Sequence, residues 1–178
     1  MDGERRQNAT TVEHRVKTET TMLDLSLVSA LYHTAREITH KTPQIGGTLA
    51  GNCTTVHFGM LDTARQIFGA PVQLSIGSIT LDGTTYYDFT EEELLSWRSG
   101  HTRPRYGLHA WLSLPHLGNE VIDLTLAATL NHAKPGWVPA AITFITARIA
   151  TRLNLEYHAR LVGDGVLEEL NLVRGRQA

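Results

Sequence analysis

Residues 106–125 read YGLHAWLSLPHLGNEVIDLT and contain two apolar stretches separated by PHLGN. In the first stretch apolar residues occupy alternate positions, a spacing typical of a strand with one buried face. Proline, glycine and asparagine between the stretches favour a turn. The segment therefore predicts an antiparallel hairpin with strands over residues 106–114 and 120–124.

The length of the turn decides which side chains of this hairpin share a face. If residues 115–119 form a five-residue turn, Leu114 lies opposite Glu120, and His109 and Asp123 become diagonal neighbours on one face, about 7–8 Å apart at the backbone. A carboxylate and an imidazole can bridge that gap, whereas a four-residue turn would place Asp123 on the opposite face. The other face carries an apolar stripe that we expect to pack against a helix. Its members are Leu108, Ala110, Leu112 and Leu114.

Two helices are expected before this hairpin. Apolar residues recur at helical spacing over residues 23–40 and again over residues 53–68. Asn52 is a candidate N-cap for the second helix, and Gly69 followed by Pro71 is a stop signal. The second helix therefore begins at Cys53, the only cysteine of the chain.

The rest of the chain adds strands and short helices. The patterns predict, in order, strands over residues 71–81 and 84–89 joined by an Asp-Gly turn, a capped helix over 90–97, a helix over 139–153, a strand over 155–162 and an amphipathic segment over 166–173. Helices followed by antiparallel hairpins favour an α+β fold over a doubly wound sheet. We expect residues 1–21 to form a mobile arm and residues 22–178 a single domain.

Composition narrows the class of protein. The 178 residues are 42% hydrophobic and 19% charged, as in ordinary globular domains. Lysines and arginines are scattered and the formal charge is −2, so we expect no nucleic-acid partner. Apolar runs fall short of the roughly 18 residues of a membrane span. A single cysteine excludes an intramolecular disulfide, and we expect a cytoplasmic location without membrane association.

Cys53 is a candidate nucleophile. A cysteine in the first turn of a helix lies near the positive end of the helix dipole and near unpaired N–H groups, which favour thiolate over thiol. A lone cysteine can equally be a small buried apolar residue. A thiol nucleophile needs an imidazole and usually a third group that fixes its tautomer, and His109 with Asp123 fits that need. A purely structural pair of His109 and Asp123 is the alternative.

Three short motifs resemble a known superfamily. Gly51-Asn52-Cys53, His109-Ala110-Trp111 and the segment VIDLT at residues 121–125 are similar to the motifs of the transglutaminase-like branch of papain-like thiol enzymes. The intervals of 56 and 14 positions between the Cys, His and Asp are similar to those of the family. Across residues 44–126 the resemblance implies a papain-like core, in which the helix bearing the cysteine packs on an antiparallel sheet bearing the histidine and aspartate.

The same resemblance implies a chemistry. Cys53 would be the nucleophile, His109 the base and then the acid, and Asp123 the residue that orients the imidazole. The substrate would be an amide or peptide carbonyl of a protein or peptide, attacked through a thioester by a peptidase, glutamine deamidase or acyl transferase that needs no cofactor. The backbone N–H of Cys53 and the side chain of Gln44 are the candidate oxyanion donors.

The candidate walls of a substrate groove are Trp97, Trp111, Tyr86 and Tyr87, although aromatic residues in strands and helices often belong to the core. Two other functions remain open. A non-catalytic module could keep the fold and use the cleft for binding. A zinc site could combine Cys53 with His57 and with His101, His109 or His116, but the chain has no compact metal-ligand spacing, so we expect no metal. We expect His57 at the helix surface or in support of the site, and His116 in solvent.

Overall fold

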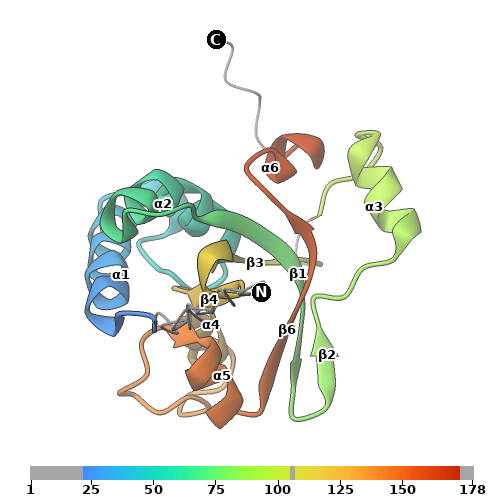
Figure 1. The fold of residues 1–178 in the computed structure, drawn as a ribbon. Coiled ribbons are helices and arrows are strands. Elements are labelled where there is room, and N and C mark those ends of the chain that lie inside the picture. Colours follow the sequence, from blue (N-terminus) through green and yellow to red (C-terminus); the bar gives the residue numbers. More distant parts are fainter. Residues whose placement is uncertain (1–21, 105–106, 173–178) are drawn as a thin grey trace, which may run out of the picture.

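An antiparallel sheet with helices on both faces forms the framework of the protein (Figure 1). The computed structural model describes residues 22–104 and 107–172, without the side chain of Gln44. The strands within these ranges are β1 (Gln73–Leu81), β2 (Thr84–Tyr86), β3 (His109–Leu114), β4 (Glu120–Asp123), β5 (Ile145–Thr146) and β6 (Leu155–Val162). Their order is β2-β1-β3-β4-β5, β6 pairs with β1, and every pair is antiparallel. The predicted α+β class is confirmed.

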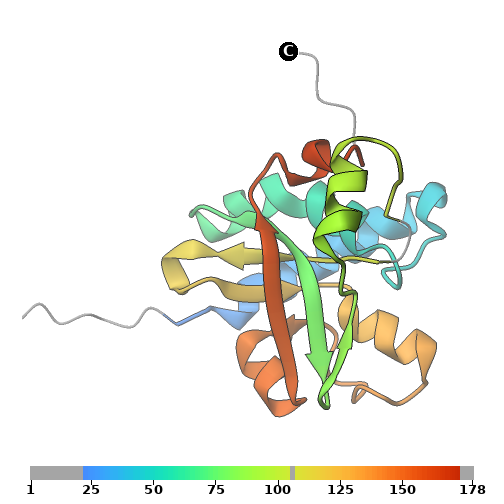
Figure 2. The same ribbon diagram turned by 90° about the vertical axis from the view of Figure 1, so that its right-hand side faces the viewer.

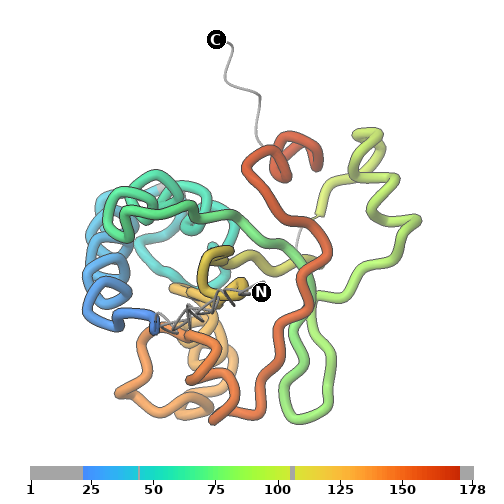
Figure 3. Tube along the Cα trace, in the orientation of Figure 1, coloured from blue at the N-terminus to red at the C-terminus, as the bar shows by residue number. Residues whose placement is uncertain are grey.

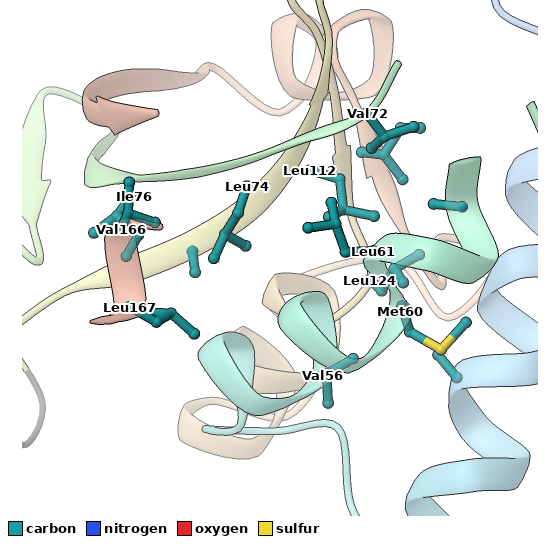
Figure 4. Packing of buried hydrophobic residues seen from close by; sticks show 14 of the residues in the cluster. Val56, Met60, Leu61, Val72, Leu74, Ile76, Leu112, Leu124, Val166 and Leu167 are labelled. Atoms are coloured by element: carbon teal, nitrogen blue, oxygen red, sulfur yellow. The ribbon is translucent and has the colours of Figure 1, made fainter. Parts of the chain in front are cut away.

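The larger core lies between the sheet and two long helices, α1 (Leu25–His40) and α2 (Cys53–Phe68). Apolar residues of α2 at helical spacing, such as Val56 and Met60, face Leu112 and other inward side chains of the sheet (Figure 4). The stripe from Leu108 to Leu114 belongs to this core, as the alternation predicted. This packing holds the first turn of α2 against the start of β3.

A smaller core lies on the opposite face of the sheet. Leu74 and Ile76 of β1 belong to the larger core, whereas Ile79 and Leu81 belong to the smaller one, because side chains two residues apart share a face. Helices α4 (Leu126–Ala133) and α5 (Ala147–Arg152) cover that second face, and Figure 1 shows them together below β3 and β4, with α2 above.

The hairpin of β3 and β4 has the predicted register. Leu114 lies opposite Glu120, and Leu112 lies opposite Ile122. The connection contains a short 3-10 helix, η2 (Pro115–Leu117), followed by Gly118 and Asn119, which both have left-handed backbone angles. His109 and Asp123 consequently lie on the same face, the one that carries the smaller core.

Strand β6 runs along β1 for most of its length, and their traces lie side by side in both views (Figure 2 and Figure 3). The register shifts between Ile76 and Gly77, which marks a bulge. Gly77 pairs with His109 on one side and with Ala159 on the other. A Cβ at Gly77 would lie 1.9 Å from the carbonyl oxygen of His158, so only glycine fits this point of the sheet.

Several boundaries differ from the sequence prediction. The helix expected over residues 139–153 is confined to α5, because the run TFIT at residues 143–146 is rich in β-branched and aromatic residues and becomes extended, ending in β5. Helix α4 was not predicted. Strand β2 ends at Tyr86 because Tyr87 has a φ of 59°, outside the strand region.

The remaining elements are short. They are η1 (Pro43–Ile45), α3 (Glu91–Arg98), which begins with the predicted capping box of Thr90 and Glu93, and α6 (Val166–Glu169). The predicted arm at residues 1–21 lies outside the described residues, as do Tyr106 and Val173 of the predicted strand and final segment. Within the described part of the chain, none of the helices has both the length and the apolar character needed to cross a bilayer.

Candidate active site

Cys53 is the first residue of α2 and is partly exposed. Asn52 occupies the N-cap position as predicted, but its side-chain amide donates to loop carbonyls instead of capping the helix. Its acceptors are Ile45, Thr48 and Ala50. The N–H of Gly51 donates to the hydroxyl of Thr129 at 3.0 Å, which ties this loop to α4. The loop is therefore braced while the first N–H groups of α2 remain available beside the sulfur.

The structure brings His109 and Asp123 into direct contact. Nε2 of His109 donates to Oδ2 of Asp123 at 2.6 Å, and both side chains are buried. The tyrosine hydroxyl of Tyr157, on β6, donates to the same oxygen at 2.9 Å. Since Nε2 is engaged by the carboxylate, Nδ1 is the ring nitrogen left for another partner.

The Cys53 sulfur lies beside this ring. Sγ is 4.0 Å from the carbonyl oxygen of Leu108, the residue that precedes His109. Against the effect of burial, Asp123 and to a smaller extent Cys53 raise the pKa of His109. The start of α2, the start of β3 and the end of β4 thus bring together the three side chains selected from the sequence.

The second oxygen of Asp123 has a different task. Oδ1 accepts hydrogen bonds from the N–H of Thr125 at 2.9 Å, its hydroxyl at 3.1 Å and the N–H of Leu126 at 3.0 Å. These donors belong to the beginning of α4, so the carboxylate also satisfies the N-terminus of that helix. Five hydrogen bonds in all fix the orientation of Asp123.

The buried charges explain the titration of the pair. Burial disfavours the imidazolium of His109, but the charge of Asp123 and the hydrogen bond to it, together with Cys53, raise its pKa to about 10. Burial alone would raise the pKa of Asp123, yet His109, His57 and the Thr125 N–H hold it well below its usual range. The electrostatics therefore favour an imidazolium paired with a carboxylate.

His57 also contacts the candidate site, more closely than the sequence indicated. Its side chain is fully buried, so the alternative of a helix-surface position is wrong. Its Nδ1 lies 2.8 Å from the carbonyl oxygen of Cys53, and its Nε2 accepts from the N–H of Leu124 at 2.9 Å and lies 3.6 Å from Oδ1 of Asp123. Burial, as the largest cause, lowers the pKa of His57 to about 4.

Aromatic rings surround His109. The rings of Tyr87 and Trp111 are stacked against the imidazole, with centroids 5.2 and 6.0 Å from it. Trp111 also makes an edge contact with Tyr157 at 5.0 Å and lines a groove of about 410 Å³ with Ser75 and other residues of the sheet. The sequence offers both Trp111 and Tyr87 as groove residues, but no local pattern indicates the left-handed backbone of Tyr87.

The other two candidate site residues are Trp97, which lies apart from Cys53 and His109, and Gln44, whose side chain is outside the described residues. Trp97 is 5% exposed and packs on Phe89 with ring centroids 5.0 Å apart, and its rim lines a separate surface pocket with Thr90. It is mainly a core residue, and its contact with substrate stays a prediction. Gln44 lies in η1, and its side chain is outside the described residues, so its oxyanion role also stays a prediction.

The histidines do not assemble a metal site in the described ranges. Residues 22–104 and 107–172 contain no group of three or more His, Cys, Asp or Glu side chains arranged to hold an ion. The lone pair on Nε2 of His57 is already engaged by the Leu124 N–H, so this ring has no nitrogen free for zinc. His116 is exposed in η2, as expected.

Comparisons with models of known families, with curated proteins and with solved structures give no match to this chain. The contact between His109 and Asp123 and the place of Cys53 at the tip of α2 define the candidate site.

Proposed function

We propose that this protein is a cysteine-dependent enzyme of the transglutaminase-like type, with a papain-like core, that attacks an amide or peptide carbonyl through a thioester. One observation carries the proposal. His109 is held through Nε2 by a buried carboxylate, while the sulfur of Cys53 lies at the start of a helix beside the same ring. A merely structural pair of His109 and Asp123 would not require a cysteine at this position.

The first step is activation of the thiol. Before substrate arrives, the proton of Cys53 is held on Nδ1 of His109, and the negative charge of Asp123 stabilises this imidazolium. The thiolate gains from the imidazolium and from the N-terminus of α2. The thiolate then attacks the carbonyl carbon, forming the C–S bond and moving the carbonyl electron pair onto oxygen.

The oxyanion needs donors at the tip of α2. The backbone N–H of Cys53 belongs to the first turn of the helix, whose N–H groups have no intrahelical acceptor. Gln44 is the proposed side-chain donor, because it belongs to the segment that leads from α1 to Cys53. Both donors would act only on the charged intermediate and so lower the barrier to attack.

The intermediate collapses when His109 donates its proton to the leaving amine, which breaks the C–N bond and leaves the acyl group on sulfur. Water or a second amine then attacks the thioester while His109 accepts the proton of this nucleophile. The acyl group leaves, and the sulfur departs as thiolate. Whether water or an amine serves as acceptor separates a peptidase or deamidase from an acyl transferase.

Alkylation by iodoacetamide provides a direct test. We expect Cys53 at pH 6.5 to react at least about tenfold faster in the unmodified protein than in His109→Ala, because the imidazolium stabilises the thiolate. His116→Ala is the matched control, since His116 is exposed in the turn, at the other end of the hairpin from His109 and Asp123. Equal rates in the protein and in His109→Ala would contradict the proposal and favour a non-catalytic binding module.

A second measurement examines the thioester. Incubation with p-nitrophenyl acetate followed by intact-mass analysis should reveal an acetyl adduct that hydroxylamine removes and that Cys53→Ser does not form. Metal analysis of the same preparation tests the remaining alternative, a zinc protein. One zinc per chain that disappears in Cys53→Ser would indicate a zinc protein instead of an enzyme.

A further inference from the structure

His57 is a fully buried histidine with both ring nitrogens engaged, and the proposed reaction does not use it. It lies one helical turn after Cys53, on the face of α2 that points into the protein. A histidine in this position lowers the stability of the core unless each ring nitrogen has a hydrogen-bond partner, because water is excluded there. The identity of its partners is therefore informative.

These partners determine the tautomer. The N–H of Leu124 is always a donor, so Nε2 of His57 must accept and carry no proton. The proton is then on Nδ1, which donates to the carbonyl oxygen of Cys53 at 2.8 Å. The ring is thus a neutral bridge with one defined direction, from the backbone of Cys53 to the backbone of Leu124.

The bridge joins two elements that each carry part of the proposed site. Cys53 is the first residue of α2, and Leu124 directly follows Asp123 at the end of β4. The first turn of a helix frays more readily than the helix interior. The same ring edge lies 3.6 Å from Oδ1 of Asp123, so it also occupies the space behind the carboxylate.

We propose that His57 is a positioning residue, which fixes the sulfur-bearing first turn of α2 relative to Asp123 and thereby relative to His109. This inference rests on the proposed function, since it assigns His57 a task in the geometry of that reaction. His57 acts through the backbone of Cys53, to whose carbonyl oxygen its Nδ1 donates. A small displacement at that point is sufficient for a large effect, because misplacement of a reacting group by about 1 Å can cost about 100-fold in rate.

Three substitutions separate the two ends of the bridge. His57→Phe keeps a ring of similar shape and removes both hydrogen bonds. His57→Gln keeps an amide oxygen near the place of Nε2, where it can accept from Leu124. His57→Asn keeps an amide donor near the place of Nδ1, where it can reach the Cys53 carbonyl. Met60→Ala, on the same face of α2, is the control for a loss of core packing without loss of the bridge.

The readouts are far-UV circular dichroism, the midpoint of urea unfolding, and the rate of Cys53 alkylation by iodoacetamide between pH 5 and 9. We expect His57→Phe to remain folded and to react with iodoacetamide about 10- to 100-fold more slowly at pH 6.5, with a changed pH profile. His57→Gln should recover part of this rate. Met60→Ala should lower the unfolding midpoint and leave the alkylation profile unchanged.

Two results would overturn the inference. His57→Phe with the alkylation rate and pH profile of the unmodified protein would make His57 a core residue only. An equal change in the folded Met60→Ala variant would show that any loss of packing in α2 has the same effect. If His57→Phe does not fold, His57→Gln and His57→Asn carry the same comparison. His109→Ala is measured alongside to keep the two proposals apart. An unchanged alkylation rate in His109→Ala contradicts the proposed enzyme. A slow rate in His109→Ala with a normal rate in His57→Phe contradicts only the positioning role of His57.

Discussion

The hydroxyl of Tyr157 donates a hydrogen bond of 2.9 Å to Oδ2 of Asp123, the oxygen that also accepts from His109. Tyr157→Phe removes this donor and keeps the ring against Trp111. Because the acceptor is a buried carboxylate, we expect the free energy of unfolding to fall by about 1.5 kcal/mol in urea titrations. Tyr86→Phe, on a residue that is 38% exposed, is the control and should change little. Equal stabilities for both variants would show that the hydroxyl does not support the carboxylate.

Asp123 orients His109 through one oxygen and accepts from the beginning of α4 through the other. Two substitutions distinguish these roles. In Asp123→Asn the oxygen can continue to accept from Thr125 and Leu126, while the amide now faces His109 as a donor. His109 must then accept through Nε2 and carry its proton on Nδ1, which is the wrong tautomer for taking a proton from Cys53. We expect an intact fold with turnover, or alkylation of Cys53, reduced by about 100-fold or more.

Asp123→Ala should differ from the asparagine variant in stability. It removes the oxygens that satisfy the beginning of α4, and loss of such a cap together with a buried hydrogen-bond network destabilises a protein by several kcal/mol. Thermal unfolding followed by circular dichroism compares the two. Normal turnover in a folded Asp123→Asn variant would remove Asp123 from the proposed reaction, whatever the result for alanine.

Gly77 connects the fold to the site, since it pairs with His109 on one side and faces the β6 bulge on the other. In Gly77→Ala the new Cβ would meet the carbonyl oxygen of His158 at 1.9 Å, and backbone atoms cannot rotate away as a side chain can. We expect a loss of at least about 1–3 kcal/mol in the free energy of unfolding, measured in urea. Gly59→Ala, inside helix α2 at an exposed position where a Cβ meets open space, controls for glycine replacement and should not lose stability. A Gly77→Ala protein as stable as the parent would mean that β6 shifts freely at the bulge.

The contact between His109 and Asp123 could be predicted because it is local. The turn at residues 115–119 sets the register of the hairpin, and the period of two then puts both side chains on one face. Cys53 could be placed at a helix start by its spacing from Val56 and Met60 and by the loop before it. What brings the cysteine to the hairpin is the packing of α2 on β3, which no local pattern specifies.

The features that the sequence did not predict also have physical causes. Helix α4 begins where Asp123 accepts hydrogen bonds from Thr125 and Leu126, so its start depends on a side chain already assigned to His109. Tyr157 reaches the site because β6 pairs with β1 across a long separation in sequence. For His57 a signal was present, since it shares the helical spacing of Cys53, Met60 and Ala64. A histidine on an apolar stripe indicates a buried polar contact rather than a surface position.

The two buried histidines should give the stability of this protein a maximum near neutral pH. The pKa of His57 falls from 6.5 to about 4 on folding, so between these values the unfolded chain binds a proton that the folded chain excludes, and stability decreases as the pH is lowered. The pKa of His109 rises from 6.5 to about 10, so its contribution is complete below pH 6.5 and is lost as the pH rises towards 10. Asp123, whose pKa is depressed, contributes above its ordinary value of 3.8 and so adds no slope between pH 5 and 9.

Urea unfolding between pH 5 and 9 checks this balance, with slopes of up to about 1.4 kcal/mol per pH unit for each histidine. His57→Gln should flatten the acid side and leave the alkaline side, because only one of the two titrations is removed. His116→Gln, at an exposed position, should reproduce the full curve. A parent protein whose stability does not change with pH on either side would mean that neither histidine changes its proton affinity on folding, and the buried cluster would lose its electrostatic basis.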